Sequence, residues 1–125
     1  MKKLRKLILR ICVVTVVLVL AYPLLVFGRF KAIEHNTEVA HVDNSRDRLT
    51  IFYRNNCKRC KRILPQLLLK HGFEFKHFNV VNADKLSKQD IDKYDIEITP
   101  VFRINKHSYN TVDEGQIDKI WTKSK

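Results

Sequence analysis

Residues 49–72, LTIFYRNNCKRCKRILPQLLLKHG, place a strand, a pair of cysteines and a helix in immediate succession. The run LTIFY (49–53) is β-branched and aromatic, which predicts a short buried strand. A helix with an apolar face follows, and Gly72 is expected to close it in the left-handed conformation. That apolar face consists of Ile63, Leu64, Leu67 and Leu68. Cys57 and Cys60 therefore lie where the strand ends and the helix begins, a place where α/β proteins bind ligands and where unpaired amides favour an anion such as a thiolate.

The chain beyond this stretch predicts further strands and helices in alternation. We expect strands at FEFKHFNVV (73–81), 101–104 and 108–112, a turn at 105–107, an irregular helix over 84–94, and a last helix from Asp113 or Glu114 onward. That last helix should bury Ile117, Ile120 and Trp121. This order predicts an α/β domain with a mixed four-stranded sheet covered by helices on both faces, in which the first two strands run parallel with a right-handed crossover.

The first 28 residues predict one transmembrane helix behind a cytoplasmic basic flank. Five cations in residues 1–10 precede eighteen uncharged residues, ICVVTVVLVLAYPLLVFG (11–28). That length crosses most of a bilayer core, and the basic flank places the following domain outside the cytoplasm. The alternative is a cleaved signal peptide with a site at 26–28, although its apolar region would be unusually long. Cys12 is expected to be an ordinary small apolar residue of this helix.

Residues 29–48 predict a juxtamembrane linker, and residues 49–125 the folded domain. The linker is polar and irregular; its first turns can continue the membrane helix, and 39–42 can form a short edge strand. The net charge of +11 suggests nucleic acid or an anionic membrane as a partner. Nucleic acid is not expected, because the aromatic residues of the domain lie in strands and the domain lies outside the cell.

From about Leu49 onward the chain resembles thioredoxin-fold proteins, and TIFYRNNCKRCKRILPQLLLKHGFEFKHFNV resembles the opening half of glutaredoxins in particular. The shared features are a strand, a C-x-x-C at a helix start, and a helix that ends in Gly before an F-x-F strand. Pro65 resembles the kink proline of the thioredoxin active-site helix. In YDIEITPVFRI, Pro100 preceded by Thr99 resembles the cis-proline of the family.

Three departures from the family patterns stand out. Asn56 occupies the position before the first cysteine where thioredoxins have Trp, and Ile51 the position where they have a buried acid. Glutaredoxins hold glutathione with a Gly-Gly-x-Asp element. This chain has Asp113 without the preceding Gly pair, so a glutathione site is not expected. These residues leave open whether the fold is closer to thioredoxin or to glutaredoxin.

The resemblance implies a role for each site residue. Cys57 would be the exposed nucleophile that attacks a substrate disulfide as a thiolate, and Cys60 the residue that resolves the mixed disulfide. Pro100 would be cis and face the pair, and the backbone of Thr99 would pair with the substrate chain like an added strand. No cofactor is expected.

The residues themselves allow two other interpretations of the cysteine pair. Cys57, Cys60, His71 and His77 have a spacing not far from that of a zinc finger, but Gly72 and a strand separate the histidines, which a finger would carry on one helix. A purely structural disulfide at a helix start would constrain little chain entropy. Disulfide exchange is therefore preferred, and no metal is expected.

Five cations surround the cysteines, and they too have several interpretations. The cluster consists of Arg54, Lys58, Arg59, Lys61 and Arg62. These side chains can simply be solvated, or they can attract acidic substrates or anionic lipid. Lys58 and Arg59 lie between the sulfurs, where cations lower the pKa of a thiol.

The sequence thus predicts an extracytoplasmic, membrane-anchored thiol–disulfide oxidoreductase that exchanges disulfides with secreted or surface proteins through Cys57 and Cys60. It is expected to be a monomer, to favour oxidation or isomerisation, and to be recharged by a membrane or extracytoplasmic redox partner. The alternative is a non-catalytic thioredoxin-fold adaptor for secretion that binds a partner through its basic face.

Overall fold

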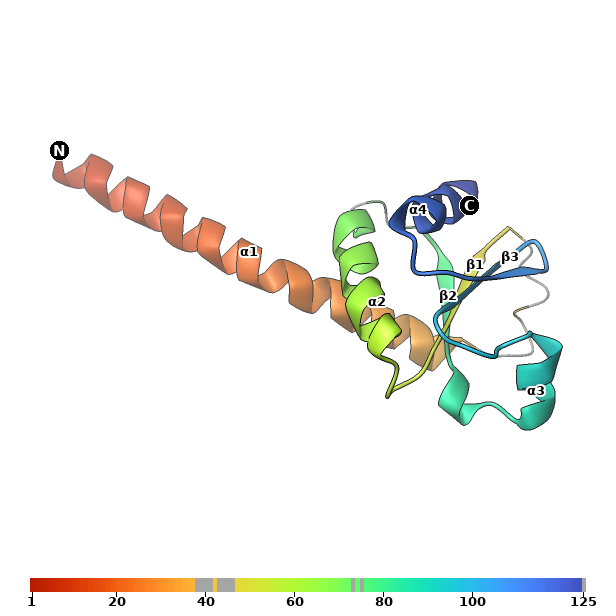
Figure 1. The fold of residues 1–125 in the computed structure, drawn as a ribbon. Coiled ribbons are helices and arrows are strands. Elements are labelled where there is room, and N and C mark those ends of the chain that lie inside the picture. The colour runs from red at the N-terminus through yellow and green to blue at the C-terminus, as the bar shows by residue number, and fades with distance from the viewer. Residues whose placement is uncertain (38–41, 43–46, 73, 75, 125) are drawn as a thin grey trace.

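The computed structural model describes residues 1–37, 42, 47–72, 74 and 76–124 (Figure 1). The helices are α1 (Lys2–Asn36), α2 (Lys58–His71), the 3-10 helix η2 (Ala83–Lys85), α3 (Lys88–Lys93) and α4 (Glu114–Lys123). The strands are β1 (Leu49–Tyr53), β2 (Phe78–Asn82), β3 (Val101–Ile104) and β4 (His107–Asn110).

The four strands form one mixed sheet in the order β2-β1-β3-β4. β1 runs parallel to β2, to which α2 connects it, and pairs antiparallel with β3, which pairs antiparallel with β4. This is the predicted sheet, with the parallel first pair that a strand–helix–strand order dictates. β1 and β2 are buried along their whole length, as the apolar and β-branched content of their sequences requires.

Helices cover both faces of the sheet. Ile51 and Phe102 belong to the larger hydrophobic cluster, which contains the apolar faces of α2 and α4, including Ile63 and Trp121. Phe52 and Val101 point into a smaller cluster beneath η2 and α3. Figure 1 shows the same division, with α2 and α4 on one side of the sheet and α3 on the other.

Three predicted elements differ in their bounds. The second strand begins at Phe78 and not at residue 73; residues 73 and 75 lie outside the described part of the chain. The helix expected over 84–94 is divided into η2 and α3, because Ser87 caps a new helix by accepting a hydrogen bond from the Asp90 amide. The last strand is His107–Asn110, because Asn105 and Lys106 both adopt positive φ and form a two-residue turn.

Gly72 is helical, with φ of −61°, so the predicted left-handed cap is wrong. The reason for a glycine here is close approach. A Cβ at this position would collide with the Tyr22 hydroxyl and would lie 2.9 Å from both the Leu68 carbonyl oxygen and Val26 Cγ2. The absence of a side chain allows α1 to pack against the end of α2.

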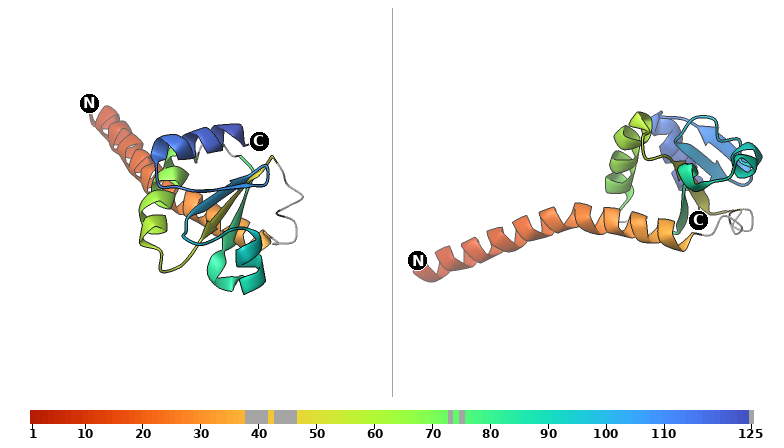
Figure 2. Two further views of the ribbon diagram at one scale, coloured as in Figure 1. Left: turned by 45° about the vertical axis from the view of Figure 1, so that its right-hand side comes forward. Right: turned by 90° about the horizontal axis from the view of Figure 1, so that it is seen from below.

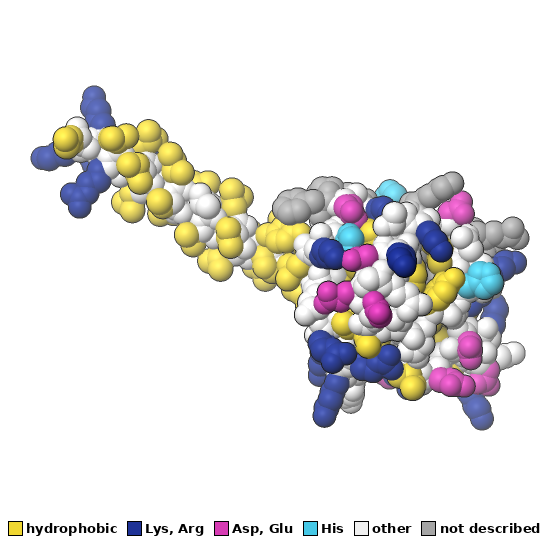
Figure 3. Space-filling model, turned by 45° about the horizontal axis from the view of Figure 1, so that its top comes forward, with side chains coloured by type: hydrophobic (Ala, Val, Ile, Leu, Met, Phe, Trp, Pro, Cys, Tyr) yellow, Lys and Arg dark blue, Asp and Glu magenta, His cyan; other side chains and the backbone are white. Residues whose placement is uncertain are grey.

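α1 is long and apolar enough, by length and composition, to cross a membrane. Its first half projects away from the domain, and Figure 3 shows hydrophobic side chains along that half and Lys and Arg side chains at its tip. Its second half lies beside the domain in every view (Figure 2). The helix continues through the first part of the predicted linker as far as Asn36; residues 39–41 of the expected edge strand lie outside the described residues.

The docked half of α1 is an integral part of the domain. Phe30 is 6% exposed and belongs to the larger hydrophobic cluster. Arg29 Nη2 donates a hydrogen bond of 2.7 Å to the carbonyl oxygen of Lys76. The hydroxyl of Thr37 accepts a 3.3 Å hydrogen bond from the amide of Val80, on the open edge of β2. α1 therefore covers an edge strand that would otherwise be free to pair with another chain.

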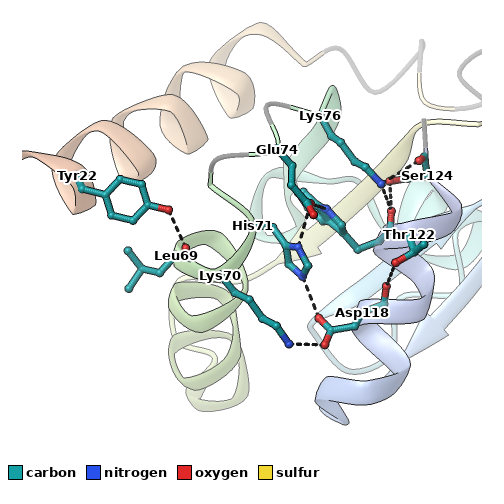
Figure 4. A network of polar contacts seen from close by, with 10 residues as sticks. Tyr22, Leu69, Lys70, His71, Glu74, Lys76, Asp118, Thr122 and Ser124 are labelled. Atoms are coloured by element: carbon teal, nitrogen blue, oxygen red, sulfur yellow. Dashed lines mark hydrogen bonds and ion pairs between the residues drawn. The ribbon is translucent and has the colours of Figure 1, made fainter.

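A polar network joins the carboxyl end of α2 to α4 (Figure 4). His71 lies between two carboxylates, with Nδ1 3.0 Å from Glu74 and Nε2 2.9 Å from Asp118, and its ring stacks on Trp121. Lys70 forms a second ion pair with Asp118. These contacts hold the end of α2 that lies farthest from the cysteines.

Candidate active site

Cys57 is the N-cap of α2, beyond the carboxyl end of β1 as the sequence predicts. Its Sγ accepts a 3.0 Å hydrogen bond from the backbone amide of Cys60, so one of the unpaired amides of the helix end points at the sulfur. Cys57 and Cys60 form a disulfide with their Cα atoms 5.2 Å apart. Cys57 is partly exposed, whereas Cys60 is 2% exposed and packs in the core. The two cysteines therefore differ in exposure, which the predicted roles of an attacking and a resolving residue require.

The loop before β3 brings Thr99 and Pro100 to the cysteines. The Thr99–Pro100 peptide bond is cis, as the resemblance implied. The Thr99 carbonyl oxygen lies 3.3 Å from Cys57 Sγ, and the side chains of Thr99 and Pro100 are buried. When the disulfide is reduced, this carbonyl is placed to accept a hydrogen bond from the Cys57 thiol.

The segment between β1 and Cys57 is held by side chains from the end of β2. The Asn55 amide donates a 3.0 Å hydrogen bond to Asp84 Oδ2, and its side-chain oxygen accepts one of 3.2 Å from Asn82. Asn82 Oδ1 in turn accepts from the Asp84 amide. These residues were missed in the sequence analysis. The signal was available, because Asn55 follows the first predicted strand and Asn82 lies at the end of the second, and the carboxyl ends of parallel strands meet at one edge of a sheet.

The five cations lie in the segment that carries the disulfide, and Arg54 and Lys61 line a groove together with Cys60. Lys58 is exposed, and Arg59 Nη2 donates a 3.1 Å hydrogen bond to Asn110 Oδ1 of β4. Within the part of the chain that the structure describes, the ion pairs found are those of Lys31, Lys70 and His71. The positive charge around Cys57 is thus not neutralised by a carboxylate of the described residues.

A second polar cluster, also missed from sequence, lies between α1 and the end of β1. Tyr53 Oη donates a 2.6 Å hydrogen bond to Glu34 Oε2, and Lys31 Nζ donates to both, at 2.9 Å and 3.1 Å. Burial raises the pKa of Glu34, but the hydrogen bonds from Tyr53 and Lys31 outweigh it and hold that pKa below its ordinary value. Burial and the bond to Glu34 raise the pKa of Tyr53, and the bond to Tyr53 raises the pKa of Lys31 despite its burial.

Beside Cys60 lies a groove of about 240 Å³ between α1, the end of β1 and α2, which we call the Cys60 groove. Its floor is apolar, with Phe30 and Leu64, and Lys31, Arg54 and Lys61 also line it. Arg54 Nε is buried and has no hydrogen-bond partner within the part of the chain that the structure describes. A buried donor without a partner is costly, so this atom is suited to an acceptor supplied by a ligand.

The histidines of the zinc hypothesis are not gathered at the cysteines. His71 is at the opposite end of α2 from Cys57 and is engaged by Glu74, Asp118 and Trp121. No cluster of three or more metal-ligating side chains occurs among the residues described. Thr99 is therefore in contact with Cys57, whereas His71 lies at the other end of α2.

No protein-family model matches the chain, and no curated protein matches its sequence. Several solved structures resemble its fold, among them two thioredoxins. Fasciola hepatica thioredoxin has a TM-score of 0.51 and 19% identity, with 69% of this chain and 89% of that one covered. Thioredoxin f2 of Chlamydomonas reinhardtii has a TM-score of 0.51 and 22% identity, with 65% and 82% covered. At these identities the likeness establishes a thioredoxin-like fold.

Proposed function

We propose that this protein is a membrane-anchored thiol–disulfide oxidoreductase that acts on extracytoplasmic proteins through Cys57 and Cys60. The observation that carries the proposal is the position of Cys57 Sγ, at the amino end of α2, within 3.0 Å of the Cys60 amide and 3.3 Å of the Thr99 carbonyl. This environment provides a donor for a thiolate and, next to it, backbone to which a substrate chain can bind.

The reaction consists of two exchange steps with balanced electrons. The Cys57 thiolate attacks a client disulfide, forms a mixed disulfide and releases one client thiolate. The Cys60 thiolate then attacks Cys57 Sγ, which releases the second client thiol and leaves the Cys57–Cys60 disulfide. Two electrons pass to the client in this direction, and the reverse sequence oxidises a client dithiol. A separate redox partner restores the starting form.

The substrate would lie along the loop that carries Thr99. The backbone of Thr99 is adjacent to Cys57, and an extended client chain that pairs with it would bring its own sulfur to Cys57 Sγ. Pro100 follows with its side chain buried, which fixes the position of this loop.

We further propose that α1 is retained as a single-pass anchor with its basic end in the cytoplasm. Support comes from contacts on both sides of the candidate signal-cleavage site at 26–28. Tyr22 precedes that site and contacts Leu69, and Phe30 follows it and is buried in the domain. Cleavage would interrupt a helix that packs against the domain on either side of the cut.

The expected direction is oxidation or isomerisation. Lys58 and Arg59 lie between the sulfurs in sequence, and α2 begins without an acidic residue in its first turn. Cations and a helix amino end both favour a thiolate, and a stabilised reduced form makes the disulfide a stronger oxidant.

Trapping of clients tests the proposal. In a Cys12→Ser background, Cys60→Ser should accumulate mixed disulfides between Cys57 and client proteins, because the resolving thiol is missing. The matched control Cys57→Ser should not. Equal trapping by both variants, or by neither, would contradict the enzyme and favour a non-catalytic adaptor, to which the cationic surface would then belong.

A further inference from the structure

Within the described part of the chain, the cations near the disulfide have no carboxylate partner, whereas cations at the other end of α2 are paired. At the carboxyl end of α2, Lys70 and His71 each contact Asp118. At the amino end, the five cations between residues 54 and 62 form no ion pair with a carboxylate of the described residues. The cations at the carboxyl end of α2 are thus paired with a carboxylate, whereas those at the amino end have no carboxylate partner among the described residues.

Two of these cations, Arg54 and Lys61, line the Cys60 groove, and Lys31 lines it with them. The Nε atom of Arg54 is buried and finds no hydrogen-bond partner among the described residues. The apolar floor lies against Cys60. A guanidinium flanked by an ammonium group and lined by apolar surface matches a carboxylate on a short aliphatic stem, as in Glu or Asp.

We infer that the client segments carry acidic side chains next to the reactive cysteine, and that one of these carboxylates enters the Cys60 groove to bind Arg54 and Lys61. The inference rests on the proposed exchange function and adds its substrate class. The carboxylate contributes binding only; the electrons pass between sulfurs as described above.

The position of the cations favours a polypeptide over a membrane surface. Tyr22, where α1 first meets the domain, contacts Leu69 at the carboxyl end of α2. The amino end of α2, with the cysteines, points away from the projecting half of α1 (Figures 1 and 2). An anchored domain would therefore present these cations to soluble chains.

Two disulfide peptides that differ only in charge test the inference. One carries Glu on both sides of its cysteine and the other carries Gln. Each is reduced in a single turnover by the full chain in nanodiscs of neutral phosphatidylcholine, after the Cys57–Cys60 disulfide has been reduced with dithiothreitol and the reagent removed, so that kcat/KM is the second-order rate constant. Because opposite charges accelerate encounter and a charge-assisted hydrogen bond prolongs the complex, we expect kcat/KM to be about tenfold higher for the Glu peptide at low salt. The preference should shrink as ionic strength rises to about 1 M, where the Debye length is about 3 Å.

The preference should fall towards unity in Arg54→Gln and Lys61→Gln and persist in Lys88→Gln, an exposed cation on α3 that serves as the matched control. Lys61 is exposed, so its variant keeps the test valid if Arg54→Gln does not fold. Equal kcat/KM for the two peptides in the wild type would overturn the inference. So would a preference that all three variants retain, or an effect of Lys61→Gln that appears only when anionic lipid is added to the nanodiscs.

The neutral small disulfide 2,2′-dithiodipyridine separates failure of the inference from failure of the proposed function. If the wild-type protein reacts with this reagent through Cys57 but shows no peptide preference, the exchange function stands and the proposed acidic substrate class is contradicted. A reduced protein that reacts with neither peptide nor reagent contradicts both.

Discussion

Tyr22, on the helix that leaves the domain, donates a 2.7 Å hydrogen bond to the carbonyl oxygen of Leu69 near the end of α2. The contact is made over Gly72, where a Cβ would collide with the Tyr22 hydroxyl. The bond satisfies one of the carbonyls that a helix end leaves without a partner. The candidate membrane anchor is thus fixed to the helix that carries the cysteines, which gives the redox centre a defined orientation relative to α1.

We expect Gly72→Ala to destabilise the protein by about 1–3 kcal/mol, because the added methyl group overpacks the contact between α1 and α2. Gly28→Ala is the control: it lies in α1 with no atom within 4 Å of the added Cβ, and should be neutral or stabilising by up to about 1 kcal/mol. Thermal unfolding in the same detergent micelles compares the two. If Gly72→Ala were as stable as Gly28→Ala, the packing described at Tyr22 would be wrong.

Truncation should separate the two halves of α1. Removing residues 1–20 deletes exposed helix and should leave the domain folded, whereas removing 1–36 also deletes Phe30, which is 6% exposed in the core. Loss of a buried Phe side chain alone costs about 3–5 kcal/mol. Urea unfolding should therefore give a much lower midpoint for the second truncation. Phe30→Ala in the first truncation is the single-residue form of the test, and a stability unchanged by it would contradict the integral role of α1.

The local features of the fold were predictable from sequence, and the long-range ones were not. LTIFY, the capping Cys57 and the apolar face of α2 are set by residues within a few positions of one another, so the strand, the helix and their junction were predicted correctly. The cis bond at Pro100 followed from the family resemblance and not from periodicity.

The contacts missed all join segments distant in the sequence. Tyr53 and Glu34 are 19 residues apart, and Asn55 and Asp84 are 29 apart. The pairing of Tyr53 with Glu34 depends on how α1 packs beside β1, which no local pattern encodes. The pairing of Asn55 with Asp84 could be inferred only from the expected parallel arrangement of β1 and β2. Gly72 illustrates the limit: glycine at a helix end suggests a left-handed cap, but Tyr22, fifty residues earlier, supplies the real reason.

The two cations that separate Cys57 from Cys60 in the sequence should raise the reduction potential of the cysteine pair. Replacing Lys58 and Arg59 by Gln removes charge that favours the Cys57 thiolate, so the reduced form loses stability and the potential should fall by roughly 10–30 mV, where 30 mV corresponds to about 1.4 kcal/mol. The same change at Lys61 and Arg62 removes equal charge outside the inter-cysteine segment and should have a smaller effect. Equilibration with glutathione buffers at low salt measures both. Equal shifts in the two double variants would indicate a general field and not a tuning role for Lys58 and Arg59.

The ion pairs at the carboxyl end of α2 should make stability depend on acid pH. The hydrogen bonds from Lys70 and then His71 hold the pKa of Asp118 below its ordinary value. Burial raises the pKa of Glu74, but the hydrogen bond from Trp121 and the contacts with His71 outweigh it and lower that pKa. A carboxyl whose pKa is lower in the folded state stabilises the fold at pH values above its unfolded pKa of about 4. That stability is lost as the pH falls through the folded pKa, when the carboxyl must be protonated. At pH values below about 4, the melting temperature should therefore decrease.

Asp118→Asn should lower the melting temperature at neutral pH and make its decline in acid less steep. Glu34, whose pKa is also lowered, keeps part of that dependence on pH. Asp92→Asn, exposed on α3, is the matched control and should reproduce the wild-type profile. A profile for Asp118→Asn that runs parallel to the wild-type curve through the acid range would show that these ion pairs do not contribute to stability.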